Sequence, residues 1–373
     1  VSIVGRAYYS NNPPCGAFRG FGVPQSCFAA EMNLNLLAEM AGLTPFEIRY
    51  RNAIRPGQVL PNGQIAGPDT GLVETLEAVR DYMESHPKAG IACAMKNSGL
   101  GVGIPDVGRV RLHVSGALVN IHSSAACIGQ GMGTVLTQIV HETTGLPLKK
   151  LAYRVPDTAS APDSGNTTAS RQTLFTGEAA RRAALELKKA LGEHTLEELE
   201  GREFRGEYCG VTDPMGSEKP NPVSHVAYSY ATHVADLGED GRVKLILAAH
   251  DVGRAINPRL LRGQIYGGVQ MGVGMALSEE LVYDSKGRPK SASLSRYTMI
   301  NAPSMPKVGV LLVEEGEPGG PFGGKSIGEI CTAPVAPAIA NAVNASLGTM
   351  MTELPFTPER ILAALSARRE TNA

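Results

Sequence analysis

The sequence lacks tryptophan altogether, and aromatic residues make up only 5% of its 373 positions. Charged residues account for 19%, below the roughly 25% that is typical of globular proteins. Basic and acidic residues nearly cancel, with 35 lysines and arginines against 36 aspartates and glutamates. This balance argues against a protein that coats nucleic acid and against a polybasic surface that binds membranes.

Long apolar runs are also missing, since none approaches the roughly 18 residues of a membrane-spanning helix. The N-terminus lacks the basic, apolar and small-residue pattern of a secretory signal peptide. The six cysteines form no C-x-x-C pair and the eight histidines show no zinc-binding spacing, which argues against iron–sulfur and zinc frameworks. We therefore expect a cytoplasmic protein with buried thiols and no membrane partner.

Glycine, by contrast, is abundant: there are 43 glycines in the 373 residues, well above the roughly 7% of an average protein. No repeat or low-complexity tract contains them. Many are therefore expected where the backbone turns tightly or comes close to another group. The hydrophobic fraction of 43% is ordinary, and the length is enough for two or three domains with a sizeable core.

The first ninety residues are predicted to be mainly helical. Apolar residues recur every four positions over 25–41 and predict a helix there. Thr44-Pro45-Phe46-Glu47 predicts a capping box that opens a second helix. A loop rich in proline and glycine follows at 54–69, and an amphipathic helix is predicted over 71–85.

From residue 90 onward the pattern indicates strands, with hairpins at 109–122 and 226–251. Further helices are predicted over 174–191, 258–281 and 336–347, and a strand over 308–314. Helices mixed with mostly antiparallel strands predict the α+β class.

The stretch Gly319–Ser326 fits the pattern G-x-x-x-x-G-K-[ST] of a phosphate-binding P-loop. However, a linker containing Pro318 separates it from the preceding strand, and Gly328 interrupts the helix that should follow. No later strand ends in an aspartate that could hold magnesium. A P-loop ATPase is therefore only a minor alternative, beside glycine-rich turns that bind no ligand.

Two other loops carry donors that could bind an anion. Gly129–Thr134 stands before a helix, where backbone N–H groups and the helix dipole favour phosphate. Thr167–Thr173 is a polar loop that could present several donors. Each also has a plain structural explanation, namely close packing for the first and a capped helix start for the second.

Glu329 is the most suggestive single residue, because it lies in a glycine-rich segment and could act as a general base. A lone glutamate is nevertheless usually a solvated surface group. Arg19 lies between Phe18 and Phe21 and could orient an anion or an oxygen, or could stack on those rings.

Six motifs follow one another in a fixed order: Ala17–Gln25, Gly129–Gly131, Thr168–Thr173, Gly253–Pro258, Gly263–Ile265 and Gly324–Glu329. In this order they resemble the molybdenum-binding subunit of the xanthine dehydrogenase/aldehyde oxidase family. The resemblance covers nearly the whole chain and implies the C-terminal part of that family's molybdopterin-binding region. It divides the chain into the end of a first cofactor-binding domain (1–55), a linker and helix (56–89) and a second cofactor-binding domain (90–373).

The resemblance implies an oxidoreductase with a molybdopterin dinucleotide, of which the cytosine form is expected, carrying molybdenum with oxo and sulfido ligands. The metal would have no direct side-chain ligand from the protein. Glu329 resembles the family's general base, with Arg19 beside the metal's oxygens. The expected reaction is hydroxylation, with oxygen derived from water, of a carbon in a purine- or nicotinate-like ring.

Other residues receive their roles from the same resemblance. Phe21 and Ser98 are expected to contact the substrate. The cofactor is expected to lie against Phe18, Gly20, Gln130, Gly131, Thr134, Thr168, Ala169, Ser170, Arg171, Gln172, Gln264, Lys325, Ser326 and Gly328.

The family's upstream half is absent from this sequence, which begins at Val1. We therefore expect either a second subunit that carries this half, as in the split subunit of nicotinate dehydrogenase, or a fragment or accessory chain without turnover. Iron–sulfur centres and FAD are expected on partner subunits of a bacterial hetero-oligomer. Ser98 stands where purine-oxidising members have an aromatic residue, which argues against purine specificity. An aldehyde oxidoreductase of the same family is a further alternative. Gly20 is not the cysteine of carbon monoxide dehydrogenases.

Overall fold

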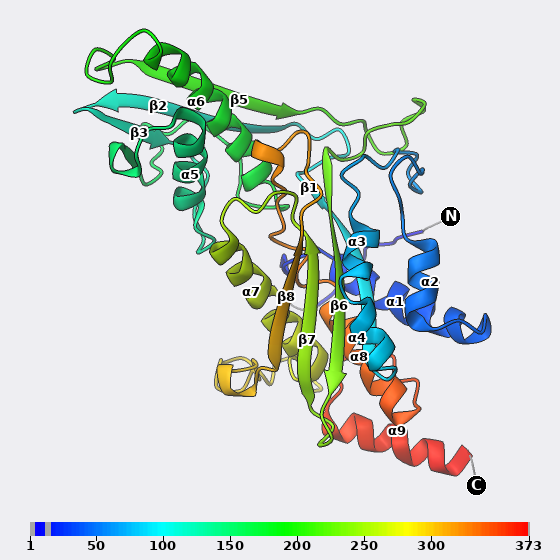
Figure 1. Ribbon diagram of the computed structural model, residues 1–373. Coiled ribbons are helices and arrows are strands. Elements are labelled where there is room, and N and C mark those ends of the chain that lie inside the picture. The colour runs from blue at the N-terminus through cyan, green and yellow to red at the C-terminus, as the bar shows by residue number, and fades with distance from the viewer. Residues whose placement is uncertain (1–3, 12–15, 372–373) are drawn as a thin grey trace.

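Two four-stranded sheets organise the computed structural model, which describes residues 4–11 and 16–371 (Figure 1). The first sheet has the order β1 (Gly90–Ser98), β6 (Ala227–Leu237), β7 (Val243–Asp251) and β8 (Lys307–Val313). The second has the order β4 (Leu151–Tyr153), β3 (Leu118–His122), β2 (Asp106–Ser115) and β5 (Glu203–Gly210). One pair in each sheet is parallel, β7 with β8 and β3 with β4, and the other pairs are antiparallel.

Helices pack against the faces of both sheets. They are α1 (Val23–Met40), α2 (Pro45–Asn52), α3 (Leu72–Glu77), α4 (Arg80–Ser85), α5 (Met132–Thr144), α6 (Gly177–Leu191), α7 (Pro258–Leu277), α8 (Val335–Leu347) and α9 (Pro358–Thr371). A π-helical turn at Gln172–Thr176 leads into α6. This mixture of helices and mostly antiparallel strands confirms the predicted α+β class.

Several sequence-based predictions of individual elements are confirmed. The capping box of α2 is present, since the Thr44 hydroxyl accepts from Glu47 N at 3.1 Å and Glu47 Oε2 accepts from Thr44 N at 2.8 Å. Two differences stand out. The helix expected over 71–85 is divided into α3 and α4, and the hairpin at 109–122 is extended by β5, whose pairing with β2 the sequence did not indicate.

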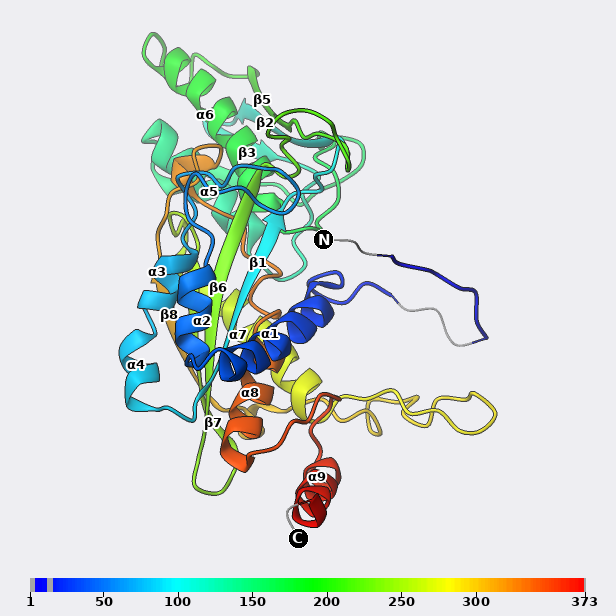
Figure 2. The same ribbon diagram turned by 90° about the vertical axis from the view of Figure 1, so that its right-hand side faces the viewer.

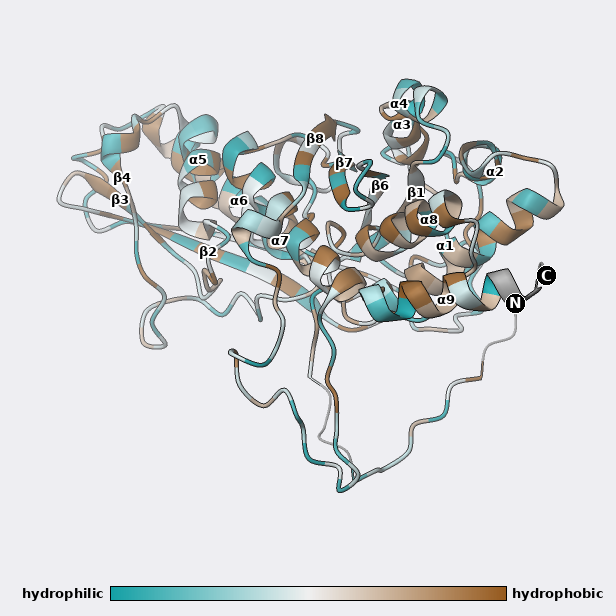
Figure 3. Ribbon diagram, turned by 90° about the horizontal axis from the view of Figure 1, so that it is seen from below, coloured by the Kyte–Doolittle hydropathy of each residue, from teal (hydrophilic) through white to brown (hydrophobic). Residues whose placement is uncertain are grey.

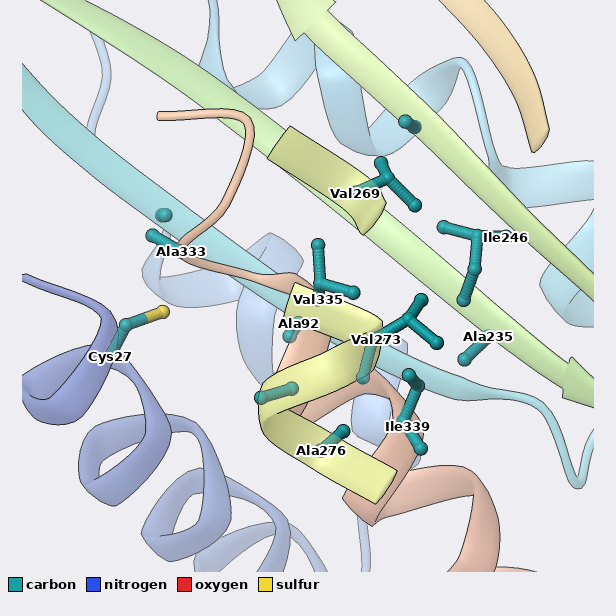
Figure 4. Close-up of a cluster of buried hydrophobic side chains, with 14 of the residues drawn as sticks. Cys27, Ala92, Ala235, Ile246, Val269, Val273, Ala276, Ala333, Val335 and Ile339 are labelled. Carbon is teal, nitrogen blue, oxygen red and sulfur yellow. The ribbon is translucent and has the colours of Figure 1, made fainter. Parts of the chain in front are cut away.

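The larger core lies between the first sheet and the helices α7 and α8 (Figure 4). Small side chains dominate it, and residues 335–344 of α8 are all buried, which agrees with its mostly brown colour in Figure 3. Close packing depends on Gly268 of α7, where an added Cβ would lie 2.4 Å from the Cys331 sulfur. This approach positions the segment from Gly324 to Cys331, which carries the sixth motif.

The second core lies between the second sheet and the helices α5 and α6. Strand β2 alternates strictly between buried and half-exposed residues, as expected for a sheet with one covered face. The loop between α7 and β8, over residues 279–301, projects away from both cores (Figure 2). The start of α7 reaches α5, where Asn257 Nδ2 donates to Gln138 Oε1 at 2.8 Å, and the candidate site lies beside this contact.

Candidate active site

Loops that are far apart in the sequence converge on one cavity of about 600 Å³. This volume lies within the range of roughly 300–1,000 Å³ that is usual for ligand sites. The residues that line the cavity come from five stretches, 17–21, 128–135, 167–173, 252–264 and 325–329. All six motifs thus contribute to one site, the short motif Gly263–Ile265 through Gln264.

Arg19 ties three of these stretches together. Its Nε donates to the carbonyl oxygen of Gly328, and its Nη2 donates to Gln264 at 3.2 Å for the backbone oxygen and 3.1 Å for Oε1. The guanidinium therefore fixes the 17–21 loop against α7 and against the segment that holds Glu329. The alternative of a stacked Arg19 between Phe18 and Phe21 does not occur among the cation–π contacts of the described residues.

Glu329 lines the cavity and is bound through one carboxylate oxygen. Its Oε2 accepts from the Ser170 hydroxyl at 3.0 Å and lies 3.1 Å from Lys96 Nζ. The Glu329 backbone N–H also donates to Ser170 Oγ at 3.0 Å. The Glu329 side chain is 14% exposed and that of Lys96 is 5% exposed, so this is a nearly buried ion pair at the edge of an open cavity.

Backbone strain gathers at this site. Ala169 and Ser170 have φ values of 48° and 50°, and Phe21 has a φ of 54°, in the left-handed region that side chains other than glycine seldom adopt. All three residues line the cavity. Such conformations persist only where surrounding contacts hold them, and they concentrate at functional sites. One such contact is Gly99 N donating to Ala169 O at 2.9 Å.

The loop before α5 offers a cluster of backbone donors. Gly129 and Gly131 have φ values of 109° and 82°, and Gly129 and Gln130 line the cavity. Although burial raises the pKa of the Cys127 thiol, backbone N–H groups of the four residues from Gly129 to Met132 outweigh it and lower the pKa below its ordinary value. The loop therefore stabilises negative charge, as an anion-binding helix N-terminus does.

The charged residues that line the cavity are mostly basic: Arg19, Arg171, Arg254, Lys325 and Glu329. Two of the basic side chains are committed elsewhere. Arg171 Nε donates to Asp106 Oδ1 at 2.6 Å, and Lys325 Nζ lies 2.6 Å from Asp251 Oδ2. Arg254 is exposed, and Arg19 is half-buried with its guanidinium bonded to Gly328 and Gln264.

Lys325 was expected to contact the cofactor, but its side chain is fully buried. It also donates to the backbone oxygen of Asp69. Burial raises the pKa of Asp251 to about 6, although the Lys325 ammonium acts in the opposite direction. Because its side chain is committed to these contacts, only the backbone of Lys325 faces the cavity. Because α8 begins at Val335, no helix starts at Lys325 and the geometry of a P-loop is absent.

Most of the remaining residues that sequence analysis selected do line the cavity: Phe18, Phe21, Gln130, Thr168, Ala169, Ser170, Arg171, Gln172, Gln264, Ser326, Gly328 and Glu329. The amides of Gln130 and Gln172 are used to shape their own loops. Gln130 Oε1 accepts from Ile128 N at 2.6 Å, and Gln172 Nε2 donates to Thr167 Oγ1 at 2.9 Å.

Four selected residues lie outside the cavity lining: Gly20, Ser98, Gly131 and Thr134. Ser98 is 1% exposed, and its hydroxyl donates to Ser326 O at 3.1 Å, so it supports a cavity loop from behind. Gly20 is buried, and an added Cβ would lie 2.6 Å from Pro24 Cδ. Thr134 is exposed on the first turn of α5.

Lys96 is the contact that sequence analysis missed. It follows Ala92 and Ala94 on the same face of β1, and both alanines are buried. Because side chains of a strand alternate between its faces, a lysine at this register must be buried and needs a partner. The position of Lys96 in this alternation is the signal that could have identified it, but reading that signal requires the bounds of β1.

In the described part of the chain, no group of three or more histidine, cysteine, aspartate or glutamate residues is placed to hold a metal ion. Likewise, none of the helices over residues 4–11 and 16–371 is long and apolar enough to cross a membrane.

Comparison with protein families gives matches over most of the chain. Two models, each described as a molybdopterin cofactor-binding domain, match residues 1–53 and residues 71–203 and 198–306. The chain is 32% identical to the xanthine dehydrogenase molybdenum-binding subunit of Escherichia coli O157:H7, over 95% of this chain and 54% of that protein. It is also 32% identical to an aldehyde oxidoreductase of Megalodesulfovibrio gigas, over 98% of this chain and 43% of that protein.

Solved structures give the same result for the fold. An aldehyde oxidoreductase from Desulfovibrio gigas superposes with a TM-score of 0.83 and 30% identity, over 94% of this chain and 42% of that one. The chain thus spans about half the length of the curated relatives it matches.

Proposed function

The chain belongs to the family of molybdenum-binding subunits that includes xanthine dehydrogenases and aldehyde oxidoreductases, and from this premise we propose that it forms the C-terminal half of a molybdenum hydroxylase site. The observation that carries the proposal is the convergence of Arg19, Ser170 and Glu329 on one cavity from loops more than a hundred residues apart. Under this proposal, residues 1–55 end a first cofactor-binding domain, 56–89 link it, and 90–373 form a second.

The residues present fit a molybdopterin dinucleotide. The donor-rich loop before α5 lowers the pKa of Cys127 through backbone N–H groups, which is the environment that a pyrophosphate requires. Ser170, Thr168 and Gln264 offer hydroxyl and amide groups for a pterin. The left-handed backbone at Ala169 and Ser170 holds these groups in place. We assign the cofactor, in its cytosine dinucleotide form, to this cavity.

When bound, the molybdenum centre supplies the two-electron oxidation and the water-derived oxygen that hydroxylates an electron-poor carbon. Glu329 acts as the proton acceptor, since its carboxylate lines the cavity and, among the residues that the structure describes, side chains bind only its Oε2. Arg19 keeps this carboxylate in position through Gly328 O.

We propose an N-heteroaromatic substrate such as a purine or a nicotinate-like ring. Phe21 supports this choice, because it lines the cavity, is 70% exposed and offers its ring for stacking. Aldehydes are the second candidate, on the strength of the similarity to an aldehyde oxidoreductase.

The electrons and the rest of the site require partners. We propose a subunit that carries the N-terminal half of the molybdenum region, together with subunits that hold iron–sulfur centres and FAD. The chain covers about half of the matched relatives, and under this proposal the partner completes the pocket.

The experiment that tests this function uses the complex purified from its native source. Molybdenum and phosphorus are quantified, co-purifying chains are identified, and xanthine, nicotinate and an aromatic aldehyde are incubated in isotopically labelled water. We expect molybdenum, a companion subunit and labelled oxygen in a hydroxylated heteroaromatic product. A molybdenum-free chain that hydroxylates none of the three would contradict the proposal.

A further inference from the structure

Next to the proposed proton acceptor lies a buried cation that the family assignment does not explain. We propose that Lys96 is a positioning residue for Glu329: it holds Oε2, leaves Oε1 as the oxygen that takes the proton, and keeps the carboxylate ionised between turnovers. This inference rests on the proposed function of Glu329.

The ammonium group of Lys96 has acceptors for all three of its N–H bonds. Nζ lies 3.1 Å from Glu329 Oε2, donates to Asn97 Oδ1 at 2.8 Å and reaches Asn97 O at 3.4 Å. Its side chain is 5% exposed, and Lys96 does not line the cavity. Lys96 therefore acts on a bound ligand only through Glu329.

The two carboxylate oxygens of Glu329 are in different surroundings. Oε2 receives the Ser170 hydroxyl at 3.0 Å and faces the Lys96 ammonium, while among residues 4–11 and 16–371 no hydrogen bond reaches Oε1. A proton placed on Oε2 would displace one of two donors, whereas a proton placed on Oε1 displaces none. The contacts thus select Oε1.

Charge balance gives Lys96 a second effect. While Glu329 is ionised, the pair is neutral, which suits its nearly buried position. Once Glu329 has taken a proton, the ammonium is left without its counter-charge in a poorly solvated site. This favours release of the proton and returns the base to its ionised form.

Two other titratable groups, Cys331 and His225, interact with this pair. Burial raises the pKa of the Cys331 thiol, and the Glu329 charge adds to this rise. Burial lowers the pKa of His225, and the Lys96 charge lowers it further. Both groups are therefore uncharged near neutral pH, and Arg19, which binds Gly328 O, is a further cation beside this segment.

The first test is the pH dependence of kcat/KM in the molybdenum-loaded complex. In Lys96→Met, loss of the adjacent cation should move the acid limb to higher pH by about one to three units, the effect of an opposite charge at this distance. Lys96→Arg keeps a cation at this position, so it should return the acid limb most of the way to its wild-type pH. Lys244→Met is the matched control, because Lys244 pairs with Asp236 at 2.9 Å in the same sheet, and it should leave the profile unchanged.

The second test does not depend on activity. Melting temperatures of Lys96→Met, Glu329→Gln and the double variant form a mutant cycle in the assembled complex. The double variant should melt at a higher temperature than Lys96→Met. In Lys96→Met the Glu329 carboxylate has lost its cation, and Glu329→Gln replaces that unpaired charge by a neutral amide. If Lys96→Met does not assemble, Lys96→Gln replaces it, since its amide can still bond Asn97.

The outcomes separate this inference from the proposed function. An active Glu329→Gln variant would overturn the role of Glu329 itself. An inactive Glu329→Gln, with an unmoved acid limb in Lys96→Met and additive melting shifts, would overturn the role of Lys96 alone. A shifted limb restored by arginine, with non-additive melting shifts, is the result we expect.

Discussion

Two lysine–carboxylate pairs in this molecule use the same chemistry for different ends. Lys96 and Glu329 are 3.1 Å apart, and Lys325 and Asp251 are 2.6 Å apart. The first pair has a carboxylate that is 14% exposed and lines the cavity. In the second pair both side chains are 0% exposed. Access, and not the pairing itself, separates a group that can exchange a proton with a ligand from one that holds the fold.

The comparison also shows what a sequence motif leaves open. Lys325 attracts attention because it follows glycines in a P-loop-like pattern, whereas Lys96 stands in no motif. A motif records residue types and spacing but not the direction of a side chain. The side chain of Lys325, which the motif selects, pairs with the buried Asp251, whereas Lys96, which no motif selects, contacts the candidate base.

The largest expected effect separates the carboxylate that lines the cavity from buried carboxylates that do not. Glu329→Gln should lower kcat by about 10²- to 10⁴-fold, the usual contribution of a general base, while molybdenum stays bound. Glu317→Gln is the matched control, since Glu317 is also nearly buried, at 5% exposure, but does not line the cavity. Steady-state kinetics with metal analysis would decide, and comparable turnover in both variants would refute the distinction.

The next prediction concerns stability. Lys325→Met leaves Asp251 buried without its cation and should lower the free energy of unfolding by about 3–5 kcal/mol. Lys96→Met should cost less, because the Glu329 carboxylate retains some solvent and its Ser170 hydrogen bond. Denaturation midpoints would rank the two variants. The opposite ranking would mean that the Lys96 pair is the structural one.

A further prediction concerns how stability depends on pH at Glu317, which is buried and does not line the cavity. Burial, with the Asp69 carboxylate adding to it, raises the pKa of Glu317 from 4.5 to about 8. Because the folded state holds this proton more tightly than the unfolded state, its stabilising contribution is complete below about pH 4.5 and is lost as the pH rises to about 8. Glu317→Gln imitates the protonated form, so its melting temperature should increasingly exceed that of the wild type over this window. If the melting temperatures of the two proteins differed by the same amount at every pH in this window, the raised pKa of Glu317 would be contradicted.

The smallest expected effect is a control for the other predictions, because it changes stability away from the candidate site. Thr44→Ala removes the capping contact of α2 and should cost about 1 kcal/mol of stability, without moving the acid limb of kcat/KM. Melting temperature and the pH profile measured together would show whether a plain loss of stability imitates the Lys96 effect. If the acid limb of kcat/KM also moved in Thr44→Ala, a shifted limb in Lys96→Met would no longer indicate a direct effect on Glu329.

Much of the fold follows from local signals. The capping box at Thr44 and the glycine that ends α5 at Gly145 mark helix ends through their own hydrogen bonds and φ angles, so the sequence is sufficient there. Strand β5 was not predicted, because it is defined by its pairing with β2 across almost a hundred residues. Long-range pairing leaves little trace in a short window.

The candidate site shows the same division. Arg19, Ser170 and Glu329 were selected by motif order, and the structure brings all three to the cavity. Ser98 and Thr134 were selected in the same way but lie behind the wall or on an outer helix face. Side-chain direction depends on the register of strands and loops in three dimensions, which motif order does not contain.

The central claim is that this cavity holds the molybdenum cofactor, and anomalous scattering at the molybdenum absorption edge from crystals of the purified complex tests it most directly. We predict a single strong peak inside the cavity, within reach of the side chains of Arg19 and Glu329. A molybdenum peak elsewhere in the complex, with this cavity empty in a fully loaded and active preparation, would contradict the account.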